Sequence, residues 1–157
     1  MITLEGKVAI VTGGAHGIGR AIAEVFSEAG ASVVIADIDK TVGRAVAMSL
    51  RNGRFVHADV AAREDAELVV KVAAGVASRI DVLCNNAAYL GETHGALDAP
   101  DEEWQRCFQV SLMGTQYFTA PRCRKSAPYL SHSNSLSPTA STLDIARLIS
   151  VILVEHI

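Results

Sequence analysis

The sequence predicts an α/β domain built on a doubly wound parallel sheet, and two observations lead to this prediction. Short runs rich in β-branched residues alternate with segments of helical periodicity through residues 1–120. A glycine-rich turn joins the first of these runs to the first helical segment. Strands that alternate with helices form βαβ units with right-handed crossovers, which set the strands parallel to one another. We therefore expect an incomplete sheet of about four parallel strands.

Four short apolar runs are the predicted strands. Each contains Val or Ile and is followed directly by a turn-forming residue such as Gly, Asp or Asn. Runs of this length and composition are typical of strands that are buried on both faces. The predicted strands are residues 7–12 (KVAIVT), 32–36 (SVVIA), 54–58 (RFVHA) and 80–84 (IDVLC).

Apolar residues recur at helical spacing after each predicted strand, which predicts four amphipathic helices. Residues three, four, seven and eight positions apart lie on one face of a helix, so each set is expected to face the core. Gly30 stands where the first helix needs a C-cap, and the acidic residues 101–103 suit the N-terminus of the fourth. The predicted buried faces are Ile18, Ala21, Ile22, Val25, Phe26 and Ala29 in the first helix; Val42, Ala45, Val46 and Leu50 in the second; Ala66, Val69, Val70, Ala73 and Ala77 in the third; and Trp104, Cys107, Phe108, Ser111, Leu112 and Thr115 in the fourth.

The chain changes character after residue 120. Residues 121–142 are rich in Pro and Ser, which predicts a loop, and residues 143–157 are strongly apolar. The apolar segment suits a helix that begins at Ser141 or Thr142, and its β-branched residues suit a strand equally well. As a strand, it would cover the exposed edge of the fourth strand as a surrogate fifth, or pair with a second chain there.

Composition and charge exclude several classes of protein. Fourteen basic and seventeen acidic residues give a net charge of -3, which argues against nucleic acid as a partner. No apolar stretch approaches the roughly 20 residues of a membrane span, and the N-terminus lacks a secretory signal. Three cysteines form no CxxC pair, which indicates reduced thiols and a cytoplasmic chain. Five scattered histidines have no zinc-ligand spacing, so we expect no metal.

The glycine-rich turn predicts a site for a dinucleotide. It follows a buried strand and precedes a helix, as in a Rossmann-like fold, where glycines allow a tight turn and close approach to a pyrophosphate. The N-terminus of the following helix supplies unpaired N–H donors and a partial positive charge to that anion. The candidate residues of this turn are Gly13, Gly14, His16, Gly17, Ile18 and Gly19.

The acid at the end of the second strand predicts which dinucleotide is preferred. Asp37 lies eighteen positions after Gly19, where a carboxylate can accept hydrogen bonds from both hydroxyls of an adenine ribose. The same charge would repel a 2′-phosphate, so NAD is expected in preference to NADP. Ile38, the next residue, is a further candidate for the coenzyme site. His16 would favour a 2′-phosphate when protonated, but it is mostly neutral near pH 7.

These residues together resemble the short-chain dehydrogenase/reductase family, over Leu4 to about Thr119. The resemblance rests on TGGAHGIG at 12–19, Asp37, Asp59-Val60 after the third strand and NNAA at 85–88 after the fourth. It implies that Asp59 and Val60 contact the adenine, and that Asn85, Asn86 and Ala87 line the coenzyme ribose. From the residues alone, Asp59 also suits a turn, and the two asparagines also suit backbone contacts at a strand end. Ala88 departs from the glycine that is usual in the family.

The family's catalytic residues are not matched in this chain. The resemblance implies a tyrosine with a lysine four residues later, an upstream serine and an asparagine on the fourth helix. Ser111 stands at the asparagine position, where it would weaken a proton relay or would instead bond to the preceding turn. The residues four positions after Tyr89, Tyr117 and Tyr129 are Thr93, Pro121 and Ser133.

The expected function follows from this mismatch. We expect residues 1–120 to be the NAD(P)-binding half of an alcohol dehydrogenase or carbonyl reductase, truncated after the fourth helix and inactive alone. An alcohol or ketone substrate would require the missing half. The alternative is a non-catalytic NAD-binding module, or a partner of a full-length relative.

Overall fold

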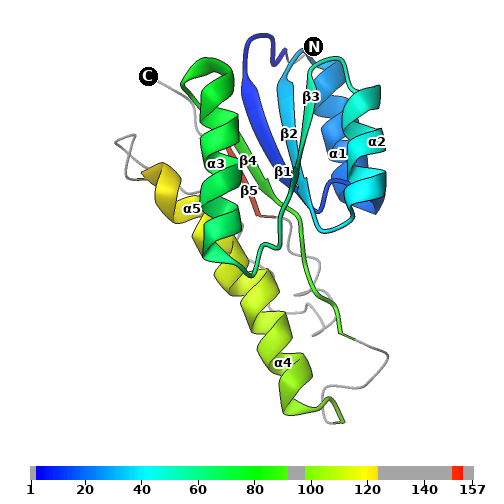
Figure 1. The fold of residues 1–157 in the computed structure, drawn as a ribbon, viewed down its shortest axis with the longest axis vertical. Coiled ribbons are helices and arrows are strands. Elements are labelled where there is room, and N and C mark those ends of the chain that lie inside the picture. Colours follow the sequence, from blue (N-terminus) through cyan, green and yellow to red (C-terminus); the bar gives the residue numbers. More distant parts are fainter. Residues whose placement is uncertain (1–2, 92–97, 124–149, 154–157) are drawn as a thin grey trace, which may run out of the picture.

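A computed structural model describes residues 3–91, 98–123 and 150–153 of the chain. The sheet has the strand order β3-β2-β1-β4-β5 (Figure 1). Its strands are β1 (Val8–Thr12), β2 (Ser32–Asp37), β3 (Gly53–His57), β4 (Val82–Asn85) and β5 (Ser150–Leu153). The helices are α1 (Gly17–Glu28), α2 (Lys40–Ser49), α3 (Arg63–Ala77), α4 (Asp101–Cys107), the π-helix η1 (Phe108–Met113) and α5 (Gly114–Cys123).

Strands β1 to β4 are parallel, and helices cover both faces of the sheet, which confirms the predicted Rossmann-like fold (Figure 1). Helices α1 and α2 lie on one face, over a core that includes Val33, Ile35 and Val46. Helices α3 and α5 lie on the other face, over a core that includes Val69 and Phe118. The carboxyl ends of β1, β2 and β4 therefore lie at the same end of the sheet.

The end of the chain pairs with the sheet as a strand. Strand β5 lies antiparallel to β4, with Asn85 opposite Ser150 and Val82 opposite Leu153. Residues 150–153 therefore form the predicted strand that covers the β4 edge, and not the alternative helix. The other residues of the segment 143–157 lie outside the described residues. Helix α5 runs to Cys123, three residues into the segment predicted to be a loop. Pro121 lies within that helix, near its end, and has no backbone N–H to donate.

The buried faces of α1 and α2 match the predicted ones only in part, since the core on this side includes the predicted residues Ile22, Phe26, Val42, Val46 and Leu50. Ile18 and Val25 are each 59% exposed, and Ala21 is also exposed. The side of α1 that contacts the sheet carries small residues, Gly19, Ala23 and Ser27, because these let the helix approach the strands closely. In α2, Ala45 is exposed, and Gly43, which packs under the Phe55 ring, is buried instead. Ala77 of α3 is also exposed, whereas the rest of the predicted α3 face packs as expected.

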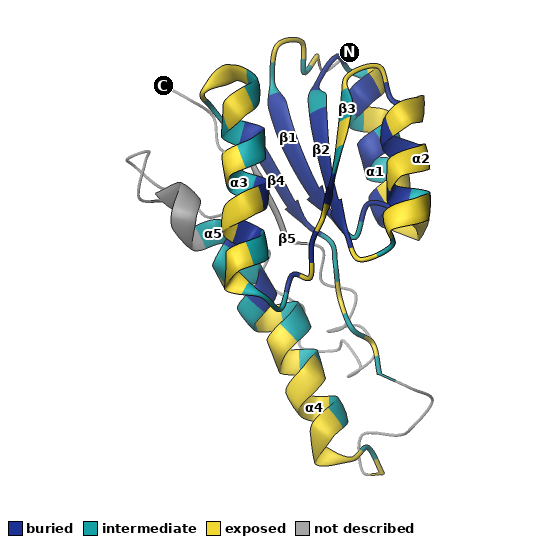
Figure 2. Cartoon of the chain, viewed as in Figure 1, coloured by how far each residue is buried: buried dark blue, intermediate teal, exposed yellow. Residues whose placement is uncertain are grey.

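The predicted buried stripe of the fourth helix is largely wrong. Trp104, Phe108 and Leu112 are all exposed, and the last two are more than half exposed. The physical reason is visible in Figure 2, where α4 and η1 extend beyond the sheet and carry mostly exposed residues. The apolar core contact of this region comes later in the chain, from the fully buried Phe118 of α5.

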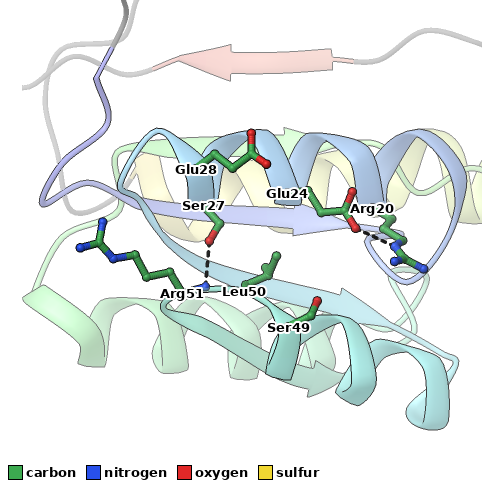
Figure 3. A pocket seen from close by; sticks show the side chains of 7 residues that line it. All are labelled: Arg20, Glu24, Ser27, Glu28, Ser49, Leu50 and Arg51. Carbon is green, nitrogen blue, oxygen red and sulfur yellow. Dashed lines mark hydrogen bonds and ion pairs between the residues drawn. The ribbon is translucent and has the colours of Figure 1, made fainter.

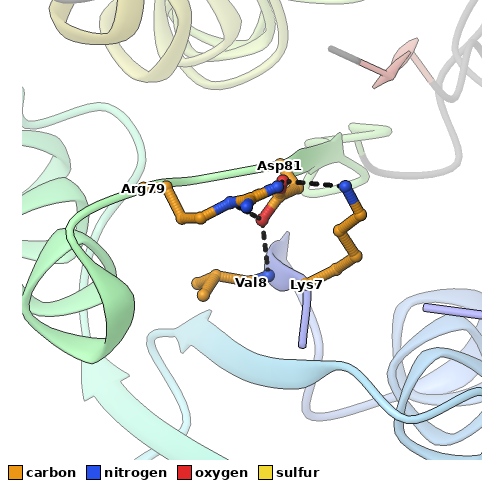
Figure 4. Close-up of polar contacts among 4 residues, drawn as sticks. All are labelled: Lys7, Val8, Arg79 and Asp81. Atoms are coloured by element: carbon orange, nitrogen blue, oxygen red, sulfur yellow. Dashed lines mark hydrogen bonds and ion pairs between the residues drawn. The ribbon is translucent and has the colours of Figure 1, made fainter. Parts of the chain in front are cut away.

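At the amino ends of the strands, Asp81 connects β1 to the start of β4 (Figure 4). Its carboxylate accepts the Val8 N–H at 2.9 Å and lies 3.5 Å from the Lys7 ammonium. Arg79 also donates to it, from Nε at 2.9 Å and from a second guanidinium nitrogen. Because the Asp81 side chain is only 5% exposed, these contacts compensate a carboxylate that has lost most of its water.

Candidate functional site

The candidate site lies where the glycine loop, residues 13–19, leaves the carboxyl end of β1. Gly13 and Gly17 have φ angles of 64° and 49°, a left-handed conformation that glycine adopts without the steric cost of a Cβ. The loop is tied to β2, because the Gly13 N–H donates to the Ala36 carbonyl at 2.8 Å. The loop therefore lies at the carboxyl ends of the strands, the position at which parallel sheets bind ligands.

Thr12 and Asn86 fix the loop to the end of β4. The Thr12 hydroxyl accepts the N–H groups of Asn86 and Ala87, both at 3.0 Å, and donates to the Cys84 carbonyl at 3.3 Å. The Asn86 amide donates in return to the carbonyls of Thr12 and Gly13 at 3.0 and 3.1 Å. Asn86 therefore performs the backbone role that the residues alone suggested for the two asparagines at the strand end. Thr12 was not among the site residues predicted from the sequence.

Close packing explains three of the loop glycines. A Cβ on Gly19 would overlap the Gly13 carbonyl oxygen and the Asn86 amide nitrogen. A Cβ on Gly13 would lie 2.9 Å from that same nitrogen, and one on Gly14 would lie 2.9 Å from Ile35 Cγ2. A Cβ on Gly17 would meet nothing within 4 Å, so that side of the loop is open. The loop thus presents backbone rather than side chains to the space before it.

Helix α1 begins differently from the other helices. His16 is its N-cap and makes no side-chain capping hydrogen bond, and the first turn holds no acidic residue. By contrast, Asp39 caps α2, and acidic residues occupy the first turns of α3 and α4. The first N–H groups of a helix have no intrahelical partner and carry a partial positive charge. At α1, neither a side-chain cap nor an acidic residue of the first turn compensates these donors.

Asp37 stands at the end of β2 beside this loop. Its carboxylate oxygens accept the N–H of Ala15 at 2.9 Å and the N–H of Asp39 at 2.9 Å. The residue is only 8% exposed, yet each carboxylate oxygen has a second lone pair with which it can accept a hydroxyl. The following residue, Ile38, is 63% exposed and presents an apolar surface beside Asp37.

Asp39 is a further charged residue of the site that the sequence analysis did not select. Its Oδ1 accepts the N–H groups of Thr41 and Val42, at 3.0 and 2.9 Å, which caps α2. Its Oδ2 lies 3.1 Å from His16 Nε2, so this hydrogen bond joins the glycine loop to the start of α2. The hydrogen bond from Val42, and then that from His16, lower the pKa of the Asp39 carboxyl, which is therefore ionised at neutral pH.

The remaining predicted residues lie at the carboxyl ends of β3 and β4. Asp59 is exposed and its Oδ1 accepts the Ala61 N–H at 2.9 Å, so it forms the turn that was the alternative to an adenine contact. Val60 is buried and packs against Gly114. Asn85 is 5% exposed, and its Nδ2 has no hydrogen-bond partner within the part of the chain that the structure describes.

Ser111 lies in the π-helix η1 and holds the segment that follows β4. Its hydroxyl accepts the Tyr89 N–H at 3.3 Å, and its carbonyl accepts the Thr115 hydroxyl at 2.9 Å. The Arg106 guanidinium lies over the Tyr89 ring, 5.2 Å from its centroid. Ser111 therefore bonds to the loop after β4 rather than back to its own preceding turn. It is a positioning residue for that loop.

A separate pocket between α1 and the end of α2 does not adjoin the glycine loop (Figure 3). Its polar groups pair with one another, since Arg20 Nε donates to Glu24 and the Arg51 N–H donates to Ser27. Across residues 3–91, 98–123 and 150–153, no cluster of three or more potential metal ligands is found. In the same ranges, every helix is too short or too polar to cross a bilayer.

Comparisons with known proteins agree with this arrangement. Residues 7–126 match the family model described as short chain dehydrogenase. An uncharacterized oxidoreductase of Thermotoga maritima is 43% identical over 115 residues, which cover 71% of this chain and 44% of that protein. The sex determination protein tasselseed-2 of Zea mays is 43% identical over 131 residues, 80% of this chain and 39% of that protein.

A similar structure is that of a 3-ketoacyl-(acyl-carrier-protein) reductase from Brucella melitensis, complexed with NADH. It superposes with a TM-score of 0.73 and 32% sequence identity, over 78% of this chain and 52% of that chain. The chain therefore spans about half the length of this reductase and less than half of the two relatives above.

Proposed function

Because the chain belongs to the short-chain dehydrogenase family, we propose that its glycine loop binds the diphosphate of a nicotinamide adenine dinucleotide. The observation that carries this proposal is the start of α1, which has neither a side-chain cap nor an acidic first turn. A diphosphate would take the free N–H groups there and the favourable end of the helix dipole. Gly13 and Gly19 keep the loop backbone close to Asn86, because a Cβ at either position would meet the Asn86 amide nitrogen.

The rest of the coenzyme would lie along the carboxyl ends of the strands. Asp37 would accept the hydroxyls of the adenine ribose, and Ile38 with the Asp59-Val60 turn would border the adenine. Asn85 to Ala87 would line the ribose on the nicotinamide side. The proposed coenzyme-binding residues are Gly13, Gly14, His16, Gly17, Ile18, Gly19, Asp37, Ile38, Asp59, Val60, Asn85, Asn86 and Ala87.

We propose NAD(H) rather than NADP(H) as the coenzyme. A 2′-phosphate at the adenine ribose would meet the Asp37 carboxylate, a like charge held on the sheet by two backbone N–H groups. Those hydrogen bonds hold the Asp37 carboxylate in place, so a 2′-phosphate could not avoid it. The two hydroxyls of NAD(H) would instead act as donors to the same oxygens.

For the 157-residue chain, we propose coenzyme binding without turnover. Bound NAD(H) supplies a hydride acceptor or donor for alcohol and ketone chemistry, and this chain's residues would bind and orient it. A proton must also move to or from the substrate oxygen, and a positioned acid/base group typically contributes about 10²–10⁴ in rate. None of the three tyrosines has a lysine four residues later. Ser111, whose hydroxyl already accepts the Tyr89 N–H, is a weak substitute.

Titration calorimetry with NAD⁺, NADH and NADP⁺ tests the proposal, followed by assays of turnover with a panel of alcohols and ketones. The expected result is binding of NAD⁺ and NADH, weaker binding of NADP⁺ and no turnover. Absence of heat from every coenzyme, on protein that shows a cooperative unfolding transition, would refute the coenzyme site. Turnover would refute only the non-catalytic part and would leave an oxidoreductase with a different acid/base residue.

A further inference from the structure

A second carboxylate stands beside Asp37 at the proposed ribose site. We infer that Asp39, held by His16, is a specificity-determining residue whose charge disfavours the 2′-phosphate of NADP(H). The inference deepens the proposed function and rests on it, because it concerns how the same coenzyme site rejects one of two ligands.

The carboxylate of Asp37 already serves to hold the glycine loop and the start of α2 in place. Each of its carboxylate oxygens already accepts one backbone N–H, from Ala15 and from Asp39. Its side chain is almost completely buried, so its charge is partly compensated by those donors before any ligand arrives. Replacement of Asp37 would therefore remove a loop anchor as well as a charge.

Asp39 lies next to that acid and is more accessible. The Asp39 N–H donates directly to Asp37 Oδ1 at 2.9 Å, so the two residues are joined at this corner of the sheet. The Asp39 side chain is 37% exposed, and its Oδ2 points to the loop residue His16 rather than to the helix that it caps. A phosphate added to a ribose that Asp37 holds would enter the field of this second carboxylate.

His16 keeps this carboxylate on the side of the glycine loop. Its Nε2 lies 3.1 Å from Asp39 Oδ2, and its side chain is 63% exposed. His16 is also the N-cap residue of α1, so the contact connects the proposed diphosphate site with the proposed ribose site. A neutral histidine can donate this hydrogen bond and leave the carboxylate charge in place.

The variant Asp39→Asn tests the inference, because asparagine caps a helix about as well as aspartate and keeps the Oδ1 acceptor. We expect the affinity for NADP⁺ to rise about tenfold, and the affinity for NAD⁺ to change by less than about threefold. The gain should shrink in about 1 M salt, where the screening length falls to about 3 Å. Asp39→Ser, which also caps without charge, should give the same shift if the first variant folds poorly.

The control is Glu67→Gln, which removes an exposed carboxylate from α3 on the opposite face of the sheet. It should leave both affinities unchanged. If NAD⁺ binds the parent chain and the Asp39 variants, but NADP⁺ binds none of them better, the inference is wrong and the coenzyme site stands. If the folded parent chain binds neither coenzyme, the proposed function and the inference both fail.

Discussion

Two glycines of this chain have opposite surroundings, and they show what the glycine loop requires of single residues. At Gly19, an added Cβ would overlap the Gly13 carbonyl oxygen and the Asn86 amide nitrogen. At Gly75, within α3, an added Cβ would meet nothing within 4 Å. Glycine at position 19 is therefore needed for close approach, whereas at position 75 it only weakens a helix.

The substitution Gly19→Ala should destabilise the fold by about 1–3 kcal/mol, because the new methyl group must push the loop away from Asn86. It should also abolish coenzyme binding, since the loop donors move. Gly75→Ala is the matched control, and it should stabilise the protein by about 0.5–1 kcal/mol. Urea unfolding and calorimetry measure both effects. Equal stability and equal affinity in the Gly19 variant and the parent chain would contradict the packing argument.

The cysteines permit a second prediction at this scale. Burial raises the pKa of the Cys84 thiol to about 11, and the thiolate is the reactive form. Iodoacetamide at pH 8 should therefore leave Cys84 unmodified in the native protein and modify it after unfolding in urea. The half-buried Cys107 should react faster in the native state. Peptide mapping by mass spectrometry distinguishes the sites, and rapid native labelling of Cys84 would show that β4 opens readily.

Single residues were predictable from the sequence where their role is local. The loop glycines and Asp37 follow from the turn between strand and helix, and the capping role of Asp39 has a local signal in its position just before α2. Thr12 was missed because its partners Asn86 and Ala87 are 74 and 75 residues away. The contact between Asp39 and His16 spans 23 residues, so the capping signal alone could not reveal it.

At the scale of helices and strands, periodicity predicted the elements better than their buried faces. In α1, two rows of residues compete for the sheet, one with Ile18 and Val25 and one with Gly19, Ala23 and Ser27. The small residues are the buried ones because they let the helix approach the strands closely, and Ile22 and Phe26 pack beside them. For α4 and η1, the sequence could not show that the helix extends beyond the sheet.

The link between η1 and the segment after β4 leads to a prediction. In Ser111→Ala, the Tyr89 N–H loses the hydroxyl that accepts it at 3.3 Å. Hydrogen exchange at the Tyr89 amide should become faster, and the stability should fall by about 0.5–1.5 kcal/mol. Ser111→Thr keeps a hydroxyl and should retain most of the protection. Unchanged exchange at Tyr89 in the alanine variant would mean that this hydrogen bond does not hold the loop.

At the scale of the whole molecule, the two ends of the parallel strands have different roles. The proposed coenzyme site lies at the carboxyl ends of the strands, and the Asp81 cluster lies at their amino ends (Figure 4). Burial by itself would raise the pKa of Asp81, but Arg79, the Val8 N–H and Lys7 together outweigh it and lower the pKa below 3.8. Since the folded pKa is depressed, this stabilisation is complete above the unfolded value and is lost as the pH falls through the folded value.

The substitution Asp81→Asn should therefore matter more at pH 6 than in acid. We expect it to lower the free energy of unfolding by about 1–3 kcal/mol at pH 6, because hydrogen bonds to a charged group are lost. The difference from the parent chain should narrow at low pH, as the pH falls through the lowered pKa of the parent carboxylate and protonates it. Urea unfolding at both pH values measures the difference, and comparison of the two proteins cancels other acids such as Asp39. A difference that does not vary with pH would contradict a role for the Asp81 charge.

The fold class and the exposed edge of β4 were predictable because both follow from the strand sequences. The antiparallel direction of β5 was not, since it depends on the path of the chain between α5 and β5. Strand β5 covers β4 from Asn85 opposite Ser150 to Val82 opposite Leu153, so its removal would expose a full strand edge. Such an edge presents unpaired N–H and C=O groups to other chains.

Deletion of residues 143–157 should thus lower the melting temperature by about 2–4 °C for each kcal/mol of strand pairing lost. It should also cause self-association that increases with protein concentration, because β4 becomes an open edge. Thermal unfolding and sedimentation velocity measure the two effects, and deletion of residues 154–157 alone is the control that keeps β5. If the longer deletion melts like the control and remains equally monodisperse, β5 does not protect the sheet. The core between the helices and β1 to β4 would then be sufficient for stability.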